Sequence, residues 1–288
     1  DGDYKLPGTA EGFRAELVKQ FPDETKDIDR LLKKLDAMKQ DSIIAQRVLY
    51  GNSNVIDKLM KRDVTMKKKL TFPFTGPTLL LDANLTADTF FRRYIKNEKL
   101  LALLFAFWPY LGLPPKEVSG VMHAFLVSGQ QFEKTFYPVG SSQTVADAMK
   151  EVIEEYGGQV LLNTEVKQII IENKKATGIE LPDDRLIKAK VVVCNAPVRY
   201  AYQELIDKQH VPKKFMKKIN NMSCSVSPFK VYLGLDFELS KNGLPNHEYL
   251  FYDSYDHEDV YKRMTNGYPA VVSAYTPNVA DPTLAPEG

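Results

Sequence analysis

The residue types best suited to metal binding or nucleophilic catalysis are widely scattered in this chain. They are four histidines and two cysteines: His123, His210, His247, His257, Cys194 and Cys224. Zinc sites need such ligands in pairs a few positions apart, so this spacing predicts no metal site. The chain also has no Gly-x-Ser-x-Gly turn, no P-loop and no Gly-x-Gly-x-x-Gly motif. By itself it shows no nucleophile and no glycine-rich turn for a pyrophosphate.

Charged side chains gather in three short runs. The acidic run comprises Asp253, Asp256, His257, Glu258 and Asp259, and the basic runs comprise Lys61, Arg62, Lys67, Lys68 and Lys69, then Lys213, Lys214, Lys217 and Lys218. A metal or acid-base cluster is one interpretation of the acidic run, but its irregular, tyrosine-rich surroundings favour a solvated loop. The basic runs are typical of solvated helix faces.

An apolar segment, residues 100–108, ends in the aromatic pair Trp108 and Tyr110. A helix that is apolar on every side is either buried in the core or in contact with lipid or an apolar substrate. Both interpretations stay open. In the second, the candidate substrate-binding residues are Phe105, Phe107, Trp108, Tyr110 and Phe125. A membrane-spanning helix is not expected, because the longest mostly apolar stretch, residues 100–113, contains Pro109 and is shorter than the roughly 20 residues that a bilayer requires.

The composition is that of an ordinary globular protein. In 288 residues, 38 Lys and Arg balance 37 Asp and Glu, giving a net charge of +1 that provides no general attraction for nucleic acid. Two cysteines are too few for a disulfide framework, and the apolar run around Cys194 predicts a buried free thiol. We therefore expect a cytoplasmic protein, with peripheral membrane contact as an alternative, and the unstructured-looking ends suggest a piece of a longer polypeptide.

The spacing of apolar residues predicts an α+β fold in which a helical lobe precedes a mixed or antiparallel sheet. Helices are expected at about 9–20, 28–38, 55–68, 86–107, 115–128, 142–156, 200–206 and 212–220. In the helix after Ser142, we expect a buried stripe of Val145, Ala146, Met149 and Val152 or Ile153. Strands are expected at 159–162, 166–172, 176–181, 188–194, 225–235, 249–252 and 270–275.

Several short motifs occur in an order known from one enzyme family. They are the segments 136–142 (Phe-Tyr-Pro-Val-Gly-Ser-Ser), 157–160 (Gly-Gly-Gln-Val), 163–166 (Asn-Thr-Glu-Val), 176–179 (Ala-Thr-Gly-Ile), 191–197 (Val-Val-Val-Cys-Asn-Ala-Pro) and 281–288 (Asp-Pro-Thr-Leu-Ala-Pro-Glu-Gly). In this order the chain resembles the phytoene desaturase, carotenoid isomerase and retinol saturase group of FAD-dependent oxidoreductases, within the amine oxidase superfamily. The family's glycine-rich N-terminal unit and C-terminal flavin-covering segment are absent, Ser141 replaces a usual glycine, and Pro197 replaces a frequent aspartate.

The resemblance implies a set of cofactor contacts in the full-length protein. Carried over position by position, these are Gly140, the backbone of Val166 against the adenine, and the loop Asn195, Ala196 and Pro197 beside the cofactor. FAD is not expected in this chain alone, because the pyrophosphate-binding helix start is missing. No catalytic side chain is singled out.

The resemblance also implies a division of the chain and a reaction class. Residues 1–135 would form a helical substrate-binding lobe, 136–206 strands and a helix belonging partly to the FAD domain, and 207–288 a substrate-domain sheet. The full-length enzyme would desaturate, saturate or isomerise carbon-carbon double bonds of a long apolar molecule such as a carotenoid, retinoid or unsaturated lipid. Two alternatives stay open: a non-catalytic lipid-binding or scaffold module with this fold, and a flavin amine oxidase.

Overall fold

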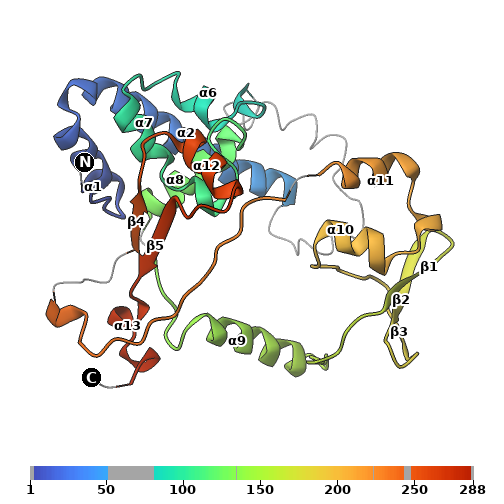
Figure 1. The fold of residues 1–288 in the computed structure, drawn as a ribbon. Coiled ribbons are helices and arrows are strands. Elements are labelled where there is room, and N and C mark those ends of the chain that lie inside the picture. The colour runs from blue at the N-terminus through green and yellow to red at the C-terminus, as the bar shows by residue number, and fades with distance from the viewer. Residues whose placement is uncertain (1–2, 51–80, 134, 223, 243–247, 287–288) are drawn as a thin grey trace. The chain divides into compact units, whose positions relative to one another are not determined.

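A computed structural model describes residues 3–50, 81–133, 135–222, 224–242 and 248–286, without the side chains of 43–50 and 240 (Figure 1). The chain divides into two compact units. Unit 1 comprises residues 1–141 and 225–288, and unit 2 comprises residues 142–224. Within the described part, no helix is both long and apolar enough to cross a bilayer. The predicted helix at 55–68 and the basic run Lys61 to Lys69 lie outside the described residues.

Unit 1 contains a helical lobe with its own apolar core. Its helices are α1 (Ala10–Gln20), α2 (Thr25–Tyr50), α6 (Ala87–Phe91), α7 (Glu98–Phe105) and α8 (Gly120–Phe132). The Thr9 side chain accepts from the N–H of Gly12 and caps α1. On α2, the predicted apolar face is confirmed, since Ile28, Leu31 and Leu35 are all buried against the lobe. Figure 1 shows these helices in one cluster.

The predicted helices at 86–107 and 115–128 have different bounds in the structure. Residues 92–97 interrupt the first, and α7 starts anew at Asn97, whose side chain accepts from the N–H groups of Lys99 and Leu100. The helix predicted at 115–128 begins only at Gly120, as α8. The carbonyls of Pro115 and Val118 instead accept from the first N–H groups of α6, so this stretch completes another helix's start and does not form a helix itself.

Unit 1 also holds a two-stranded antiparallel sheet. Strands β4 (Glu248–Tyr252) and β5 (Val271–Tyr275) pair with Leu250 opposite Ser273, as the predicted strands require. Helix α12 (His257–Thr265) connects them, and α13 (Pro277–Ala280) follows. The prediction of a strand at 225–235 is wrong. The segment pairs with no strand in the described part of the chain, and its Phe229 is 93% exposed.

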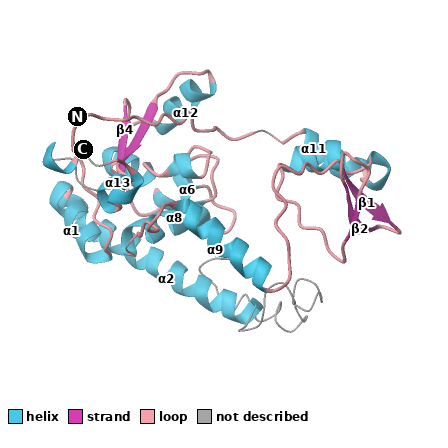
Figure 2. Ribbon diagram, turned by 90° about the horizontal axis from the view of Figure 1, so that it is seen from below, coloured by secondary structure: helices cyan, strands magenta, loops and turns pink. Residues whose placement is uncertain are grey.

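Unit 2 is built around a three-stranded antiparallel sheet of order β1-β2-β3. Its strands are β1 (Gln168–Glu172), β2 (Lys175–Glu180) and β3 (Leu186–Lys188), and its helices are α9 (Ser142–Glu155), α10 (Val198–Tyr200) and α11 (Lys213–Asn220). The sheets that the described residues form, magenta in Figure 2, are small beside the helices. The predicted β1-β2 hairpin is confirmed, with a register irregularity between Ile170 and Ile171. The predicted strand at 159–162 is not formed.

Two predictions of burial in unit 2 are wrong. The apolar stripe of α9 is exposed, Met149 by 64%. The segment 188–194 is not a buried strand, because only Lys188 belongs to β3 and Val193 is 89% exposed. In the described residues no strand pairs with 190–194, and without neighbours on both sides a strand cannot be buried. The ending of α9 is as predicted, with Gly157 in the left-handed region at φ 77°.

Candidate functional site

The aromatic segment that ends α7 lies in the core of unit 1. Phe105 is 4% exposed, Phe107 8% and Trp108 0%, whereas Tyr110 is half exposed and Phe125 packs partly buried on the core. The structure therefore supports the first interpretation of this segment, in which it is buried in the core. Phe107 and Trp108 present no surface to lipid.

A buried hydrogen-bonded chain connects this segment to α12. Trp108 donates from Nε1 to Nδ1 of His257 at 3.0 Å, and His257 Nε2 lies 2.7 Å from the carbonyl of Ala102. Because Nδ1 accepts, the proton is on Nε2 and the ring is neutral. Burial lowers the pKa of His257 accordingly. This histidine positions α12 on the helical lobe.

The prediction that the acidic run forms a solvated loop is wrong. Asp256 accepts from the N–H groups of Glu258 and Asp259, so the run starts α12 as an N-cap. Asp253 forms two hydrogen bonds with Arg263 near the other end of the helix. The carboxylates are thus used for capping and ion pairing. A cap residue followed by acidic residues and then Lys262 and Arg263 is a helix signal in the sequence.

A second buried histidine lies among aromatic rings. His123 Nε2 is 3.0 Å from the carbonyl of Leu104, and the rings of Phe91 and Phe105 pack edge-on against it. Its Nδ1 has no hydrogen-bond partner among the described residues. Burial lowers the pKa of His123 to about 4, so the ring is neutral at pH 7. Surroundings of this kind indicate a structural histidine in the core.

Polar side chains do not assemble into a metal site in the part of the chain that the structure describes, where no group of three or more His, Cys, Asp or Glu could hold an ion. One exposed polar cluster joins the end of the aromatic segment to the sheet. Tyr110 and Ser273 both donate to Oε1 of Glu248. Burial and the neighbouring carboxylate raise the pKa of Tyr110, so its hydroxyl is a hydrogen-bond donor and not a base at neutral pH.

Gly140 lies in unit 1, where its backbone is already engaged. Its N–H donates to Oδ2 of Asp281 at 2.5 Å, and Thr283 donates to the other carboxylate oxygen from N and Oγ1. Gly140 and Ser141 both adopt positive φ, 79° and 78°. The glycine suits this conformation, whereas a serine is strained there. The two motif segments 136–142 and 281–288 are thus joined by Asp281.

The other predicted cofactor-binding residues lie in unit 2. Val166 is half-buried just before β1, while Asn195, Ala196 and Pro197 follow the unpaired valine run. Among the described residues, none makes a backbone hydrogen bond with Val166, Asn195 or Ala196. These backbone groups are accordingly available to a ligand. Cys194 beside them is exposed, which corrects the predicted buried thiol.

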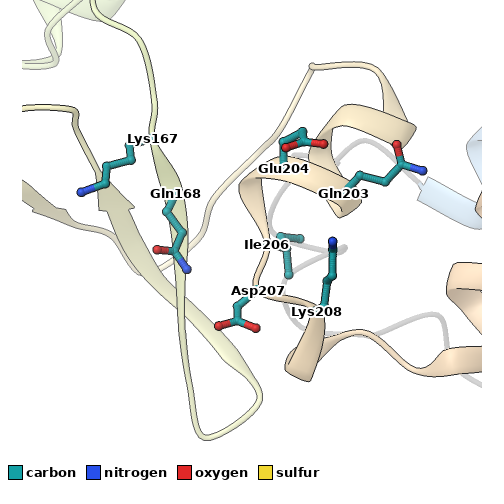
Figure 3. A pocket seen from close by; sticks show the side chains of 7 residues that line it. All are labelled: Lys167, Gln168, Gln203, Glu204, Ile206, Asp207 and Lys208. Carbon is teal, nitrogen blue, oxygen red and sulfur yellow. The ribbon is translucent and has the colours of Figure 1, made fainter.

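A hollow of about 330 Å³ opens beside the start of β1 (Figure 3). It is lined by Lys167, Gln168, Gln203, Glu204, Ile206, Asp207 and Lys208. Lys167 points away from the other labelled side chains in Figure 3, toward its partners Glu180 and Asp184. The hollow is therefore polar and of mixed charge. Sequence reasoning did not identify it, because its residues come from the start of β1 and from the helical segments at 201–205 and 208–210 with the link between them.

The chain belongs to the flavin-containing amine oxidoreductase family. The family's sequence pattern matches residues 20–286, which is most of the chain. This membership identifies a class of flavin-dependent oxidoreductases. It confirms the resemblance, as do the more specific relatives below.

Curated relatives of the chain are carotenoid desaturases. A phytoene desaturase (neurosporene-forming) of Rhodobacter capsulatus is 31% identical over 68% of this chain and 38% of its own length. A 4,4'-diapophytoene desaturase of a Methylomonas species is 29% identical over 67% of this chain and 37% of its own, and one of Staphylococcus aureus is 28% identical over 70% and 40%. The matched part of the chain thus spans about 38% of the first relative's length.

A solved oxidoreductase from Methanosarcina mazei is also similar, with 20% identity over 57% of this chain and 40% of its own, at a TM-score of 0.42. The described elements combine helices with antiparallel sheets, in agreement with the coarse prediction of a helical lobe and a mixed or antiparallel sheet.

The described residues do not by themselves fit a whole flavin. Among the described residues, the backbone at Val166 and at 195–196 makes no backbone hydrogen bond and could meet one edge of a cofactor, but the N–H of Gly140 is already bound to Asp281. No helix start in the described residues follows a Gly-x-Gly-x-x-Gly turn, the feature that holds a dinucleotide pyrophosphate. No chemical step through the flavin is therefore derived from this chain.

Proposed function

We propose that this chain is part of an FAD-dependent oxidoreductase that acts on carbon-carbon double bonds of a long apolar substrate, such as a carotenoid. The observation that carries the proposal is the similarity to carotenoid desaturases over about two thirds of the chain. Flavin, when bound, supplies the hydride chemistry, and the protein supplies binding and orientation.

The exposed apolar side chains of unit 2 support the proposal that further structural elements cover them in the full-length protein. Val193 and Met149 are exposed although they belong to a valine run and to an apolar helix stripe. Large apolar surfaces left in water are costly, at about 25 cal/mol per Å². Further strands and helices of the flavin domain would cover them. The inactivity of this chain alone follows from the same proposal.

The cofactor contacts proposed are the backbone of Val166 at the adenine and the loop Asn195 to Pro197 beside the cofactor. The backbone groups of Val166, Asn195 and Ala196, which make no backbone hydrogen bond among the described residues, support this, whereas the carbonyl of Pro197 already accepts from the N–H of Ala201. Gly140 would contribute only by shaping the turn at 140–141, because its N–H is bound to Asp281.

For the substrate, the proposed wall is Phe105, Phe107, Trp108, Tyr110 and Phe125. Only Tyr110 and Phe125 have exposed surface for an apolar molecule, while the others would support them from the core. The division into a helical lobe at 1–135, flavin-domain elements at 136–206 and a substrate-domain sheet at 207–288 likewise stays a proposal. So does a cytoplasmic location with peripheral membrane contact.

The test is to express the full-length protein and measure both its flavin content and its action on phytoene. We expect bound FAD and products with additional conjugated double bonds, detected by their absorbance after chromatography. A full-length protein without flavin would favour the non-catalytic lipid-binding alternative. A flavoprotein that oxidises small amines and leaves phytoene unchanged would favour the amine oxidase alternative.

A further inference from the structure

Helix α11 carries a dense basic face in unit 2. Its sequence is Lys-Lys-Phe-Met-Lys-Lys-Ile-Asn, and Lys213, Lys214, Lys217 and Lys218 are all exposed. At 100° per residue, the four lysines occupy one continuous arc of about 140° around the helix. The basic run noted in the sequence is therefore one face of a helix.

The opposite side of α11 is fixed to unit 2. Ile219 is fully buried, and the Arg199 guanidinium donates to the carbonyls of Asn220, the last residue of the helix, and of Met222 beyond it. Because the helix is held by these contacts, the lysine face has a set orientation toward solvent.

The lysines of this face have no acidic partner among the described residues. Within the part of the chain that the structure describes, no ion pair involves Lys213, Lys214, Lys217 or Lys218, although other exposed lysines such as Lys150 and Lys167 do form them. Helix α11 itself contains no carboxylate. Its positive charge is thus uncompensated locally, in a chain whose net charge is only +1.

An aromatic side chain lies at the edge of the basic face. Phe215 is 37% exposed, and it lines a hollow of about 340 Å³ together with Pro212, Lys214 and Lys218. Its ring packs edge-on against Tyr202 at 5.0 Å. Lysines bordering an apolar pocket are the arrangement by which short helices lie on an anionic lipid surface.

We propose that the basic face of α11 docks the protein on an anionic membrane, with Lys214 and Lys218 at the lipid headgroups and Phe215 at the acyl boundary. The proposal rests on the proposed function, since an apolar substrate is reached at a membrane. Charge complementarity decides the partner, and the apolar pocket beside the lysines favours lipid over nucleic acid. In this proposal the basic face of α11 is the lipid contact, and the aromatic residues Phe107 and Trp108 are not, because they are buried.

Co-sedimentation of the 288-residue chain with vesicles tests the proposal without any enzymatic readout. We expect binding to phosphatidylcholine vesicles that contain phosphatidylserine, little binding to phosphatidylcholine alone, and release at high salt. Each lysine near such a surface adds about fivefold to the partition coefficient, so Lys214→Gln with Lys218→Gln should lower it about 25-fold.

The matched control is Lys174→Gln with Lys175→Gln, which removes two exposed lysines at the β1-β2 turn of the same unit. It should leave binding nearly unchanged. Phe215→Ala should weaken binding less than the double lysine variant, and a thermal melt of each variant verifies folding. Equal loss in the control, no binding by the parent, or tighter binding to a short RNA than to the vesicles would each overturn the proposal. These outcomes are independent of flavin content, which tests the proposed function.

Discussion

The helical lobe of unit 1 differs from two segments of unit 2, helix α9 and the valine run 191–193, in whether apolar residues are buried. In the lobe, α1, α2, α6, α7 and α8 bury Phe13, Leu35 and Phe91 almost completely. In unit 2, α9 has no buried residue and the valine run is open. Helices adjacent in sequence can cover one another, whereas a central strand requires neighbours from distant parts of a chain. We therefore expect the helical lobe to be more stable on its own than unit 2.

Of the substitutions that test this comparison, we expect Trp108→Ala to lower the free energy of unfolding the most. The side chain is fully buried, and its loss also leaves Nδ1 of His257 without a donor. We expect the free energy of unfolding to fall by about 3–5 kcal/mol, measured by urea denaturation. The control Tyr156→Ala removes a ring that is 85% exposed in unit 2 and should change stability by less than about 0.5 kcal/mol. Similar losses in both variants would remove the distinction between the regions.

The lobe should also lose stability in acid because of His123. Its folded pKa of about 4 is below the ordinary 6.5, so the unfolded chain binds the proton more readily. Stability is then complete above pH 6.5 and decreases as the pH falls toward 4, by roughly 3 kcal/mol for this group. Denaturation midpoints across this range measure the slope. In His123→Gln, which retains a donor for the carbonyl of Leu104, the slope should be shallower, and an unchanged slope would contradict the prediction.

A smaller, local effect is expected where unit 1 ends. The hydrogen bonds from Thr283 and from the N–H of Gly140 lower the pKa of Asp281, so its contribution is present above the ordinary carboxyl pKa and is lost as the pH falls through the lowered value. Asp281→Asn should free the segment 138–142. Limited proteolysis should then cut there faster than in the parent. Asp183→Asn, in an exposed turn, serves as control and should leave this cleavage unchanged.

The smallest effect is expected from Val193→Ser. In this chain the side chain is exposed, so stability should stay within about 0.5 kcal/mol of the parent. In the full-length flavoprotein the same change should cost about 1–3 kcal/mol, because a polar group would replace an apolar one under a covering strand. Thermal melts of this chain and of the full-length protein, each with and without the substitution, measure the difference. A large loss in the isolated chain would mean that Val193 is buried there in solution.

Local patterns in the sequence determined helices α1 and α2 of the lobe, the β1-β2 hairpin, the β4 and β5 strands and the family. Spacings of three and four in 28–38 and alternation in 249–252 depend only on neighbours in the chain. Tertiary structure decided what each element covers. It placed Trp108 against His257, 149 positions away, used the carbonyls of Pro115 and Val118 to complete α6, and left the valine run and the α9 stripe uncovered. The physical reason is that burial belongs to a pair of surfaces, and the sequence pattern of one surface does not specify its partner.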